Sequence, residues 1–389
     1  MRIACIHQGY ELYGSDRCFV ESVAAIRKTF PRAEIEVVLP RIGPIAECLA
    51  DNVDRVTIEP IWVLRRRSLV SLILLGAFWL PFALARAVRR MSACDMVYIN
   101  TSVIVDYQLA ARFFPEKALL HIHEIPSGPV KPILRGLARW SRAEIIFNSR
   151  ATRAAFAPVG AAPGHVIYNG LAAPEAPEST RFDGSRPLRL LMLGRVNRIK
   201  GQEVLLRALA SLPESSRARF TVRMVGGAFE NPRRERALRD LVGELGLKRN
   251  VSIEPFTSDP SSLYRWADVV TVPSRLPESL GRVAIEAMAY GRPALVSAIG
   301  GLREVVVDGK TGWLTPPGDA EALARRLRII VEQPDAWRQF GAAARERFEA
   351  LFSEASASSA MASVLSAKLD PVGSKSWAEP DTFAAATQR

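Results

Sequence analysis

Short apolar stretches rich in β-branched residues alternate with longer amphipathic stretches along the whole chain. In the first half these short stretches predict strands at 2–8, 34–40, 55–60, 95–101, 118–124, 144–149 and 165–169. In the second half they predict strands at 189–195, 220–227, 251–256, 268–274 and 293–299. Nearly continuous apolar strands that alternate with helices are typical of parallel sheets covered on both faces. The pattern predicts a doubly wound α/β fold, in which ligands bind at the carboxyl ends of the strands.

A break in this alternation at 172–187 (AAPEAPESTRFDGSRP) predicts two domains. The stretch is rich in proline, serine and charge and has no periodicity, which is typical of a linker. The chain has 389 residues, 48% of them hydrophobic, whereas one core rarely grows past ~250–300 residues. We therefore expect two doubly wound domains with a cleft between them. The expected parts are an N-terminal domain at 1–173, a linker at 174–187, a C-terminal domain at 188–351, a helix at 352–369 that returns to the N-terminal domain, and a tail at 370–389.

Positive charge is concentrated in one part of the chain. The formal net charge is +12, and residues 60–94 contain no Asp or Glu. The arginines of this part are Arg65, Arg66, Arg67, Arg86, Arg89 and Arg90. A basic excess favours nucleic acid, anionic membranes or phosphorylated substrates as partners. No motif of interleaved aromatic and basic residues supports nucleic acid, so we expect no nucleic-acid partner.

The arginines flank an uncharged apolar stretch at 68–85 (SLVSLILLGAFWLPFALA). The stretch falls short of the ~20 apolar residues of a spanning helix, and Pro81 interrupts it. We therefore favour a helix that packs on the sheet and dips into a membrane surface over a helix that spans the membrane. Arginines beside apolar surface attract anionic lipid headgroups at ~1 kcal/mol each. The expected partner is an anionic membrane surface on the inner face of the plasma membrane, bound through 60–94.

Several absent motifs argue against other classes of protein. The four cysteines are scattered, without a Cys-x-x-Cys pair, which argues against a zinc site and suits a reducing cytoplasm. The N-terminus lacks the apolar region of a secretory signal. The phosphate loop of nucleotide hydrolases and the glycine fingerprint of dehydrogenases are missing, as is an Asp-x-Asp metal motif. We expect a cytoplasmic protein that needs no metal and no cofactor.

Two cations follow the strand at 189–195. Arg195 ends this strand, and Lys200 precedes Gly201 and the helical stretch QEVLLRAL. A glycine at a strand end, here Gly194, lets a ligand approach the backbone, and a helix start offers unpaired N–H groups. The segment is either a phosphate site with two fixed cations or a pair of solvated surface cations, and the spacing alone leaves both interpretations open.

Two glutamates lie in the segment VPSRLPESLGRVAIEAMAYGRPALVS. Glu278 follows a strand, and Glu286 lies eight positions later in a helix that we expect to start near Gly281. Carboxylates can bind sugar hydroxyls, and the N–H groups of a helix start suit anionic oxygens. Two solvated glutamates are the alternative. The turn residues Pro273 and Ser274 indicate a shaped loop and so favour a binding site.

The whole chain resembles the retaining glycosyltransferases of family 4, which are glycosyl transferases group 1 with the GT-B fold of two Rossmann-like domains. The motifs LGRVNRIKG and VVTVPSRLPESLGRVAIEAMAYGRP carry the resemblance, and weaker matches are YELYGSDR, VIYNG, MVGG and DGKTGWL. These motifs span 9–315 in the family's order. The segment with the two glutamates is the most specific of them.

The resemblance implies roles for individual residues. Arg195 and Lys200 match the cations that hold the donor's diphosphate and stabilise it as it leaves. Glu278 matches the glutamate beside the transferred sugar, and Glu286 matches the one that usually binds the nucleotide ribose. The other donor-binding matches are Gly14 and Ser15 after the first strand, Gly194, and the loop residues Ser279, Leu280 and Gly281. The family usually has a glycine pair where this chain has Gly14 and Ser15, so this match is a departure from the motif.

Two of the four histidines, His121 and His123, lie at the end of the strand at 118–124. Many family members have a histidine here, near the reacting sugar, where it can hydrogen-bond the sugar or polarise the acceptor. Side chains two apart on a strand share a face, so position alone does not choose between the two. The strand end favours His123 as the catalytic residue with Glu124 beside it, whereas we expect His121 to be structural. His7, which ends the first strand, is another candidate.

The expected function is metal-independent, retaining transfer of a sugar from a nucleotide-sugar donor to a hydroxyl acceptor. The expected acceptor is a lipid-linked sugar or a growing polysaccharide in bacterial cell-surface polysaccharide or glycolipid assembly. One alternative is a nucleotide-sugar epimerase or phosphorylase of the same fold, and product analysis separates these activities. The other alternative is a non-catalytic scaffold in polysaccharide assembly, which donor hydrolysis or transfer would exclude.

Overall fold

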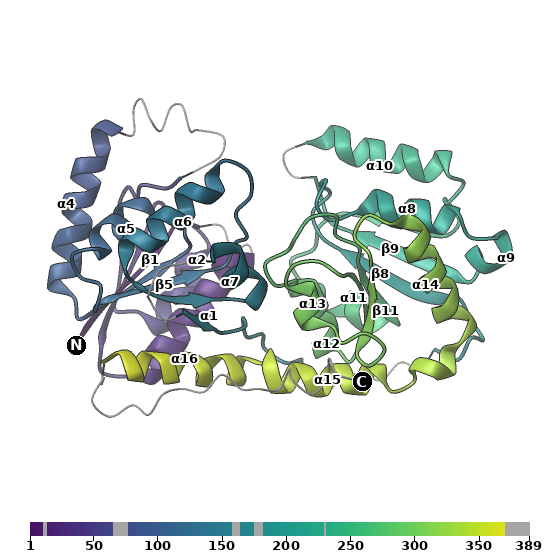
Figure 1. Cartoon of the computed structure of the whole chain (residues 1–389). Coiled ribbons are helices and arrows are strands. Elements are labelled where there is room, and N and C mark those ends of the chain that lie inside the picture. The colour runs from purple at the N-terminus through teal and green to yellow at the C-terminus, as the bar shows by residue number, and fades with distance from the viewer. Residues whose placement is uncertain (11–13, 65–76, 158–163, 175–181, 229–230, 370–389) are drawn as a thin grey trace. The chain divides into compact units, whose positions relative to one another are not determined.

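The computed structural model describes residues 1–10, 14–64, 77–157, 164–174, 182–228 and 231–369. It divides into two compact units (Figure 1). The first unit comprises Met1–Gly170 and the C-terminal helix α16 (Glu354–Leu369), and the second comprises Leu171–Ser353. Positions 175–181 of the expected linker and the expected tail at 370–389 lie outside the described residues.

The first unit is built on a seven-stranded sheet in the order β3-β2-β1-β4-β5-β6-β7, and all its strand pairs are parallel. Its strands are β1 (Arg2–His7), β2 (Glu34–Leu39), β3 (Arg55–Ile58), β4 (Met96–Asn100), β5 (Ala118–Ile122), β6 (Glu144–Phe147) and β7 (Gly164–Val166). Its other elements are α1 (Gly14–Thr29), α2 (Ile45–Leu49), η1 (Ala50–Asn52), α4 (Ala77–Ala93), α5 (Val105–Ala111), α6 (Val130–Ser141) and α7 (Arg150–Phe156).

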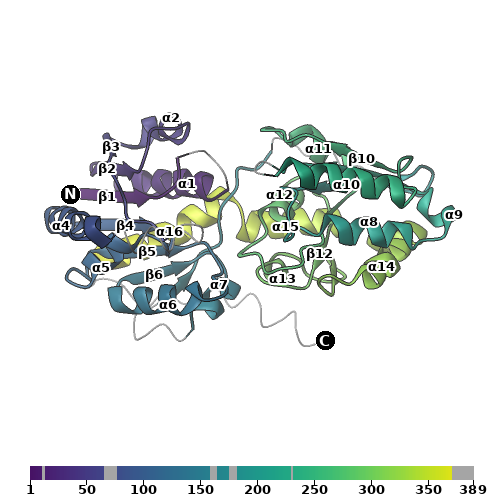
Figure 2. The same cartoon turned by 90° about the horizontal axis from the view of Figure 1, so that it is seen from above.

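Helices cover both faces of this sheet because successive strand residues point to opposite sides. In β1, Ala4 and Ile6 pack in one apolar cluster with α4, α5 and α6. Ile3 and Cys5 pack in the other cluster with α1, α2 and α16. Figure 2 shows the course of α1 and α16 along the strands of the first unit. Helix α16 thus returns from the end of the chain to lie against α1. The central strands β1, β4 and β5 are buried along almost their whole length, so their polar groups gather at the strand ends.

The second unit contains a six-stranded parallel sheet in the order β10-β9-β8-β11-β12-β13. Its strands are β8 (Leu188–Leu193), β9 (Phe220–Val225), β10 (Val251–Glu254), β11 (Val269–Val272), β12 (Ala294–Ser297) and β13 (Gly312–Thr315). Its other elements are α8 (Gln202–Ala210), α9 (Glu214–Arg217), α10 (Pro232–Glu244), α11 (Ser261–Trp266), α12 (Arg282–Ala289), α13 (Leu302–Val305), α14 (Ala320–Glu332), η4 (Pro334–Trp337) and α15 (Phe340–Leu351).

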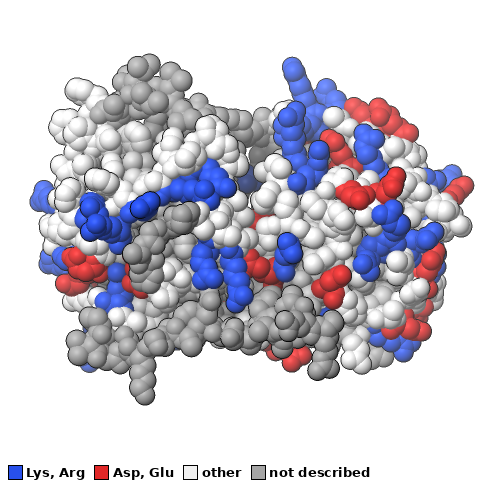
Figure 3. Space-filling model, viewed as in Figure 1, with Lys and Arg blue, Asp and Glu red and all other residues white. Residues whose placement is uncertain are grey.

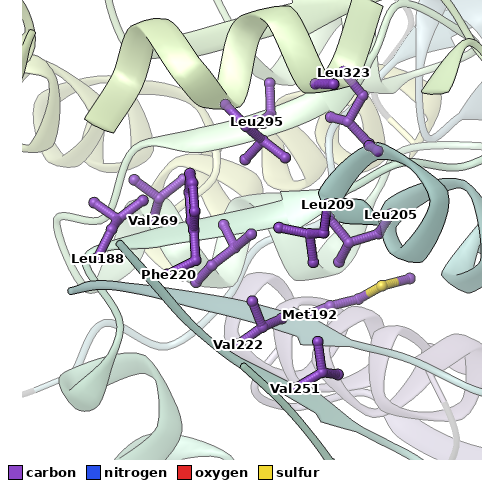
Figure 4. Packing of buried hydrophobic residues seen from close by; sticks show 14 of the residues in the cluster. Leu188, Met192, Leu205, Leu209, Phe220, Val222, Val251, Val269, Leu295 and Leu323 are labelled. Atoms are coloured by element: carbon purple, nitrogen blue, oxygen red, sulfur yellow. The ribbon is translucent and has the colours of Figure 1, made fainter. Parts of the chain in front are cut away.

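The larger apolar core of the second unit lies between the sheet and helices α8 and α14. Leu205 and Leu209 of α8 meet Leu323 of α14 and strand residues such as Val222 (Figure 4). Leu205 and Leu209 are fully buried, and burial of such a leucine stabilises the fold by about 1.5–3 kcal/mol. This packing fixes the start of α8, which borders the candidate site.

All twelve predicted strands are present, with ends that differ by up to three residues. The prediction missed β13, which is short and begins with a glycine, so it lacks a continuous apolar stretch. Of the predicted apolar helix at 68–85, the part at 68–76 lies outside the described residues, and α4 covers the remainder with Pro81 inside it. No helix in the described ranges combines the length and the apolar character needed to cross a bilayer.

Candidate functional site

Lys200 and Glu278 form an ion pair at the carboxyl edge of the sheet in the second unit. Lys200 lies in the loop between β8 and α8, and Glu278 lies in the loop between β11 and α12. Strands β8 and β11 are neighbours, so the two loops meet. Lys200 Nζ lies 2.9 Å from Glu278 Oε2, and only 22% and 13% of the two side chains are exposed. The lysine is held in place, and its ammonium group has two further N–H donors for an arriving anion.

The loop that carries Glu278 is fixed by hydrogen bonds and by a glycine. Ser274 Oγ donates to Glu278 Oε1, and the Gly301 N–H donates to the Glu278 carbonyl at 2.9 Å. Gly300 has a φ of +57°, and a Cβ there would lie 2.3 Å from the Glu278 carbonyl oxygen. Ser274, one of the turn residues that the sequence indicated, thus contacts this carboxylate, and Gly300 permits close approach to the Glu278 backbone.

Gly201 joins the two loops more closely than a side chain would permit. It caps the start of α8 with a φ of +77°, and a Cβ at this position would lie 2.0 Å from the Pro273 carbonyl oxygen. Only glycine combines a left-handed backbone with such an approach. The first N–H groups of α8 consequently open beside Lys200, where the helix dipole adds to its positive charge.

Glu286 is held separately from Glu278. It lies in α12, whose N-cap is Gly281 with a φ of +94°, as the predicted helix start requires. The Tyr264 hydroxyl donates to Glu286 Oε2 at 2.5 Å, and Arg282 Nε donates to Oε1 at 2.8 Å. Burial and the adjacent Glu286 carboxylate raise the pKa of Tyr264 well above its usual value, so this phenol remains a donor. Of the other predicted loop residues, Leu280 has a buried side chain and Ser279 is half-buried.

A pocket of about 220 Å³ borders the start of α8. Arg198, Arg234 and Arg275 line it together with Asn197 and Gln202. Basic side chains are also dense over the start of α10 in Figure 3, where Arg233, Arg234 and Arg236 follow one another. Sequence analysis missed these three lining arginines, because they come from three separate loops or helices and share no spacing. Three guanidinium groups around one hollow favour an anionic ligand.

Arg195 and Gly194 are the two remaining predicted residues of this edge. Arg195 is exposed, and its carbonyl oxygen accepts a hydrogen bond from Gln202 Nε2 at 3.0 Å. Gly194, which ends β8, has a φ of +144°, and the Lys200 side chain lies within 3.5 Å of where its Cβ would be. Within the described ranges, no three His, Cys, Asp or Glu side chains gather in a way that could hold a metal ion.

The corresponding edge of the first unit carries a buried polar cluster. His7 Nε2 lies 2.9 Å from Asp16 Oδ1, and His7 Nδ1 lies 2.9 Å from Asn100 Nδ2. Asn100 Oδ1 lies 2.8 Å from His123 Nε2. His121 accompanies them, with its ring centroid 3.9 Å from that of His123 and its Nδ1 2.6 Å from the Tyr98 hydroxyl. Burial lowers the pKa of His123 to about 3, so its ring is neutral at physiological pH.

Glu124 lies beside His123, as predicted, and is half-buried. The Ser102 N–H and hydroxyl donate to Glu124 Oε1 at 2.7 and 2.6 Å, and the His123 N–H donates to Oε2 at 3.0 Å. Burial raises the pKa of Glu124. Gly14 and Ser15 lie in the first turn of α1 rather than in the loop before it, and 11–13 lie outside the described residues. Asp16, Asn100 and Ser102 were not predicted.

Comparison with known proteins identifies the second unit. Residues 175–347 match the family model of glycosyl transferases group 1. The matched region lies within the second unit and covers less than half of the chain. The chain is 41% identical over 155 residues to a D-inositol 3-phosphate glycosyltransferase of Nocardiopsis dassonvillei. The aligned residues make up 38% of this chain and 36% of the relative. The match thus spans little more than a third of the relative's length.

Solved structures match nearly the whole chain. The structure of Anabaena HepE in complex with UDP and glucose is 25% identical, with a TM-score of 0.75 over 94% of this chain and 99% of HepE. The lipopolysaccharide outer core galactosyltransferase WaaB shares the fold at 16% identity, with a TM-score of 0.72 over 95% of this chain and 100% of WaaB. With the two parallel-sheet units, these likenesses confirm the GT-B fold class.

Proposed function

We propose that this chain transfers a sugar, with retention of configuration, from a nucleotide-sugar donor bound in the second unit to a hydroxyl acceptor. The observation that carries the proposal is the Lys200–Glu278 pair beside the start of α8, inside a region of the glycosyl transferases group 1 family. Anabaena HepE, which binds UDP and glucose, supports a UDP-sugar as donor. The nearby pocket with Arg198, Arg234 and Arg275 offers additional positive charge for an anionic part of the substrate.

The proposed mechanism relies on charge already present in the protein. As the glycosidic bond breaks, negative charge grows on the departing diphosphate and positive charge grows on the sugar. Lys200, Arg195 and the N–H groups at the helix starts oppose the first charge, and Glu278 lies by the sugar. Removal of one such group typically raises the barrier by ~3 kcal/mol. We assign no residue as a nucleophile, and the departing phosphate takes the proton of the acceptor hydroxyl. Because these cations supply the compensating charge, transfer needs no metal.

Transfer and product analysis test this proposal. We expect Lys200→Ala and Glu278→Ala to lower transfer from UDP-glucose or another nucleotide sugar by about 10²–10³-fold while the fold survives. Lys310→Ala is the matched control, because Lys310 is an exposed lysine of the same unit. Near-wild-type turnover in either site variant would overturn the assignment. A free epimerised donor or a sugar phosphate as product would identify the chain as an epimerase or a phosphorylase instead.

We further propose that the acceptor is a lipid-linked sugar or growing polysaccharide at the cytoplasmic face of a membrane. Helix α4 supports this proposal, because Phe78, Trp79 and Phe82 are 72%, 64% and 57% exposed. Their rings contact one another, with centroids 5.9–6.4 Å apart. Exposed aromatic clusters are rare on soluble surfaces, and aromatic rings favour the membrane interface. Arg86 and Arg89 on the same helix carry the charge that attracts anionic headgroups.

Vesicle sedimentation tests the membrane surface. We expect two triple variants to bind more weakly to vesicles that contain anionic lipid. One combines Arg65→Ser, Arg66→Ser and Arg67→Ser. The other combines Phe78→Ser, Trp79→Ser and Phe82→Ser. Phe113→Ser is the matched control, because Phe113 is 66% exposed in the same unit but lies outside the aromatic cluster. Unchanged binding of both triple variants would contradict the proposal.

A further inference from the structure

Four buried side chains form a continuous hydrogen-bonded relay at the carboxyl edge of the first sheet. The relay runs from Asp16 in α1 to His7 at the end of β1, then to Asn100 at the end of β4, and ends at His123 beyond β5. The exposed fractions of these residues are 4%, 0%, 0% and 8%. Strands β1 and β5 both flank β4, so Asn100 bridges the two histidines across the sheet.

Donor and acceptor chemistry gives the relay a direction. A carboxylate only accepts hydrogen bonds, so Asp16 requires a proton on His7 Nε2. His7 Nδ1 lies 2.9 Å from the Asn100 amide nitrogen, which can only donate, so Nδ1 offers its lone pair to the NH₂ group. The amide orientation leaves Asn100 Oδ1 to accept from His123 Nε2–H. His123 Nδ1 is consequently unprotonated, and its lone pair is available as an acceptor.

At the end of the relay, a buried ring nitrogen lacks a hydrogen bond of acceptable geometry to any described residue. In the described part of the chain, His123 Nδ1 and Thr101 Oγ1 are buried side-chain atoms without a hydrogen-bond partner. The Asn169 side chain lies near enough to His123 to oppose the fall in its pKa, but it makes no hydrogen bond of acceptable geometry with Nδ1. A buried polar atom without a partner destabilises a fold by about 1–3 kcal/mol, so a ligand that satisfies it binds favourably.

Backbone strain at the same place supports a ligand. Thr101 has a φ of +97°, an unusual value for a β-branched residue, and its N–H donates to the His121 carbonyl at 2.8 Å. Such strain is of the order of 1–3 kcal/mol and clusters at functional sites. Thr101 directly follows Asn100, the residue that bridges the histidines. The strained backbone of Thr101 and the buried polar atoms without a partner therefore lie at one point of the sheet edge, next to Asn100 and His123.

We propose that Asp16, acting through His7 and Asn100, is a positioning residue that fixes His123 as the Nε2–H tautomer, so that Nδ1 accepts a hydrogen bond from a substrate hydroxyl. The inference rests on the proposed sugar transfer for the identity of the substrate, but the tautomer itself is independent of any activity. A neutral His123 recognises a hydroxyl without introducing charge. A charged imidazolium at the same position would have no lone pair and would reject the hydroxyl as a donor.

Nitrogen-15 NMR of the histidine rings tests the relay in the intact wild-type chain. The chain has only four histidines, and His123→Gln identifies the His123 signals. We expect the His123 spectrum to show a protonated Nε2 and an unprotonated Nδ1, and His7 to show the same tautomer. A proton on His123 Nδ1 would overturn the proposal. So would a doubly protonated His7, because the Asn100 amide would then have to turn its oxygen toward His7.

Replacement of Asp16 tests whether its carboxylate fixes the tautomer of His123. In Asp16→Asn we expect His123 to lose its single tautomer and kcat to fall about 10–100-fold, with the donor KM unchanged. Asp16→Glu should recover part of the loss. Asp95→Asn is the matched control, because Asp95 accepts a hydrogen bond from the Arg2 N–H at the amino end of the same sheet. An unchanged tautomer in Asp16→Asn would contradict the proposal, whereas absence of transfer with the predicted tautomers would contradict only the proposed function.

Discussion

The two sheets present different chemistry at the same structural position, the carboxyl edge. In the second unit the edge is charged and lies on loops, where Lys200 faces Glu278 beside helix starts. In the first unit the edge is buried, and His7, Asn100 and His123 lie at or just beyond the strand ends, with the Asp16 carboxylate 2.9 Å from His7. A cation held beside a helix start suits a growing phosphate charge, whereas a buried, fixed lone pair suits a hydroxyl. The same sheet architecture thus supplies two sites whose selectivity depends on where the polar residues lie relative to the strand ends.

The two edges also treat left-handed backbone differently. The second unit uses glycines at such positions, among them Gly201 and Gly300. The first unit places Thr101 at a φ of +97°. Glycine allows close approach of loops without strain, and threonine at a positive φ retains strain together with a hydroxyl. We infer that the second edge is built for tight loop packing and the first for a fixed polar arrangement.

The largest expected effect is on the charged edge. Lys200→Ala should lower kcat for sugar transfer by about 10²–10³-fold, the usual effect of removing one group that stabilises transition-state charge. The thermal midpoint should change little, since Lys200 is an ion-paired loop residue rather than part of the core. Steady-state kinetics and thermal unfolding of the same preparation measure both quantities. A large loss of stability with normal kcat would contradict the catalytic role of the charged edge, because Lys200 would then serve the fold and not the reaction.

Gly201→Ala tests the packing of the loops in the second unit. The new Cβ would meet the Pro273 carbonyl oxygen and force a left-handed alanine, so we expect destabilisation by about 2–4 kcal/mol. Gly309→Ala is the control, because Gly309 has a φ of +70° but no atom within 4 Å of its Cβ position. It should lose only the strain contribution, about 1–2 kcal/mol. Chemical denaturation gives both values, and equal losses would show that close approach at Gly201 is unimportant.

The smallest effect concerns strain in the first unit. Thr101→Gly should raise the free energy of unfolding by about 1 kcal/mol, because relief of strain exceeds the entropy lost with glycine. Transfer should fall, since the hydroxyl and the fixed backbone after Asn100 are lost. Arg142→Gly provides the comparison, because Arg142 has a φ of +54° at the end of α6 and lies away from the relay. It should gain similar stability without loss of transfer. Full activity in Thr101→Gly would remove Thr101 from the site.

Sequence reasoning recovered the fold more completely than the sites, for physical reasons. Buried parallel strands such as Arg2–His7 are continuous apolar stretches, so their pattern is visible locally, whereas β13 (Gly312–Thr315) is too short and too mixed. The contact between Lys200 and Glu278, 78 residues apart, depends on which strands are neighbours, and no local spacing encodes it. Only the family resemblance placed these two residues in one site.

The relay was missed although a signal was present. His7 and Asn100 end otherwise apolar strands, and His123 directly follows another, so each would be costly to bury without a partner. Polar residues in that position predict a buried network at the sheet edge. Asp16 carried no such signal, because an acidic residue in the first turn of a helix is ordinary. Its role depends on the close approach of α1 to the end of β1.

Binding of UDP to three forms of the intact chain tests the division of labour between the two edges most directly. At a UDP concentration of about 100 times Kd, ligand binding should stabilise the wild type by about 2.7 kcal/mol. We predict the same stabilisation for Asp16→Asn, whose lesion lies in the first unit, and little or none for Lys200→Ala at the same concentration. Full stabilisation of Lys200→Ala, or its loss in Asp16→Asn, would contradict the assignment of the nucleotide to the charged edge of the second unit.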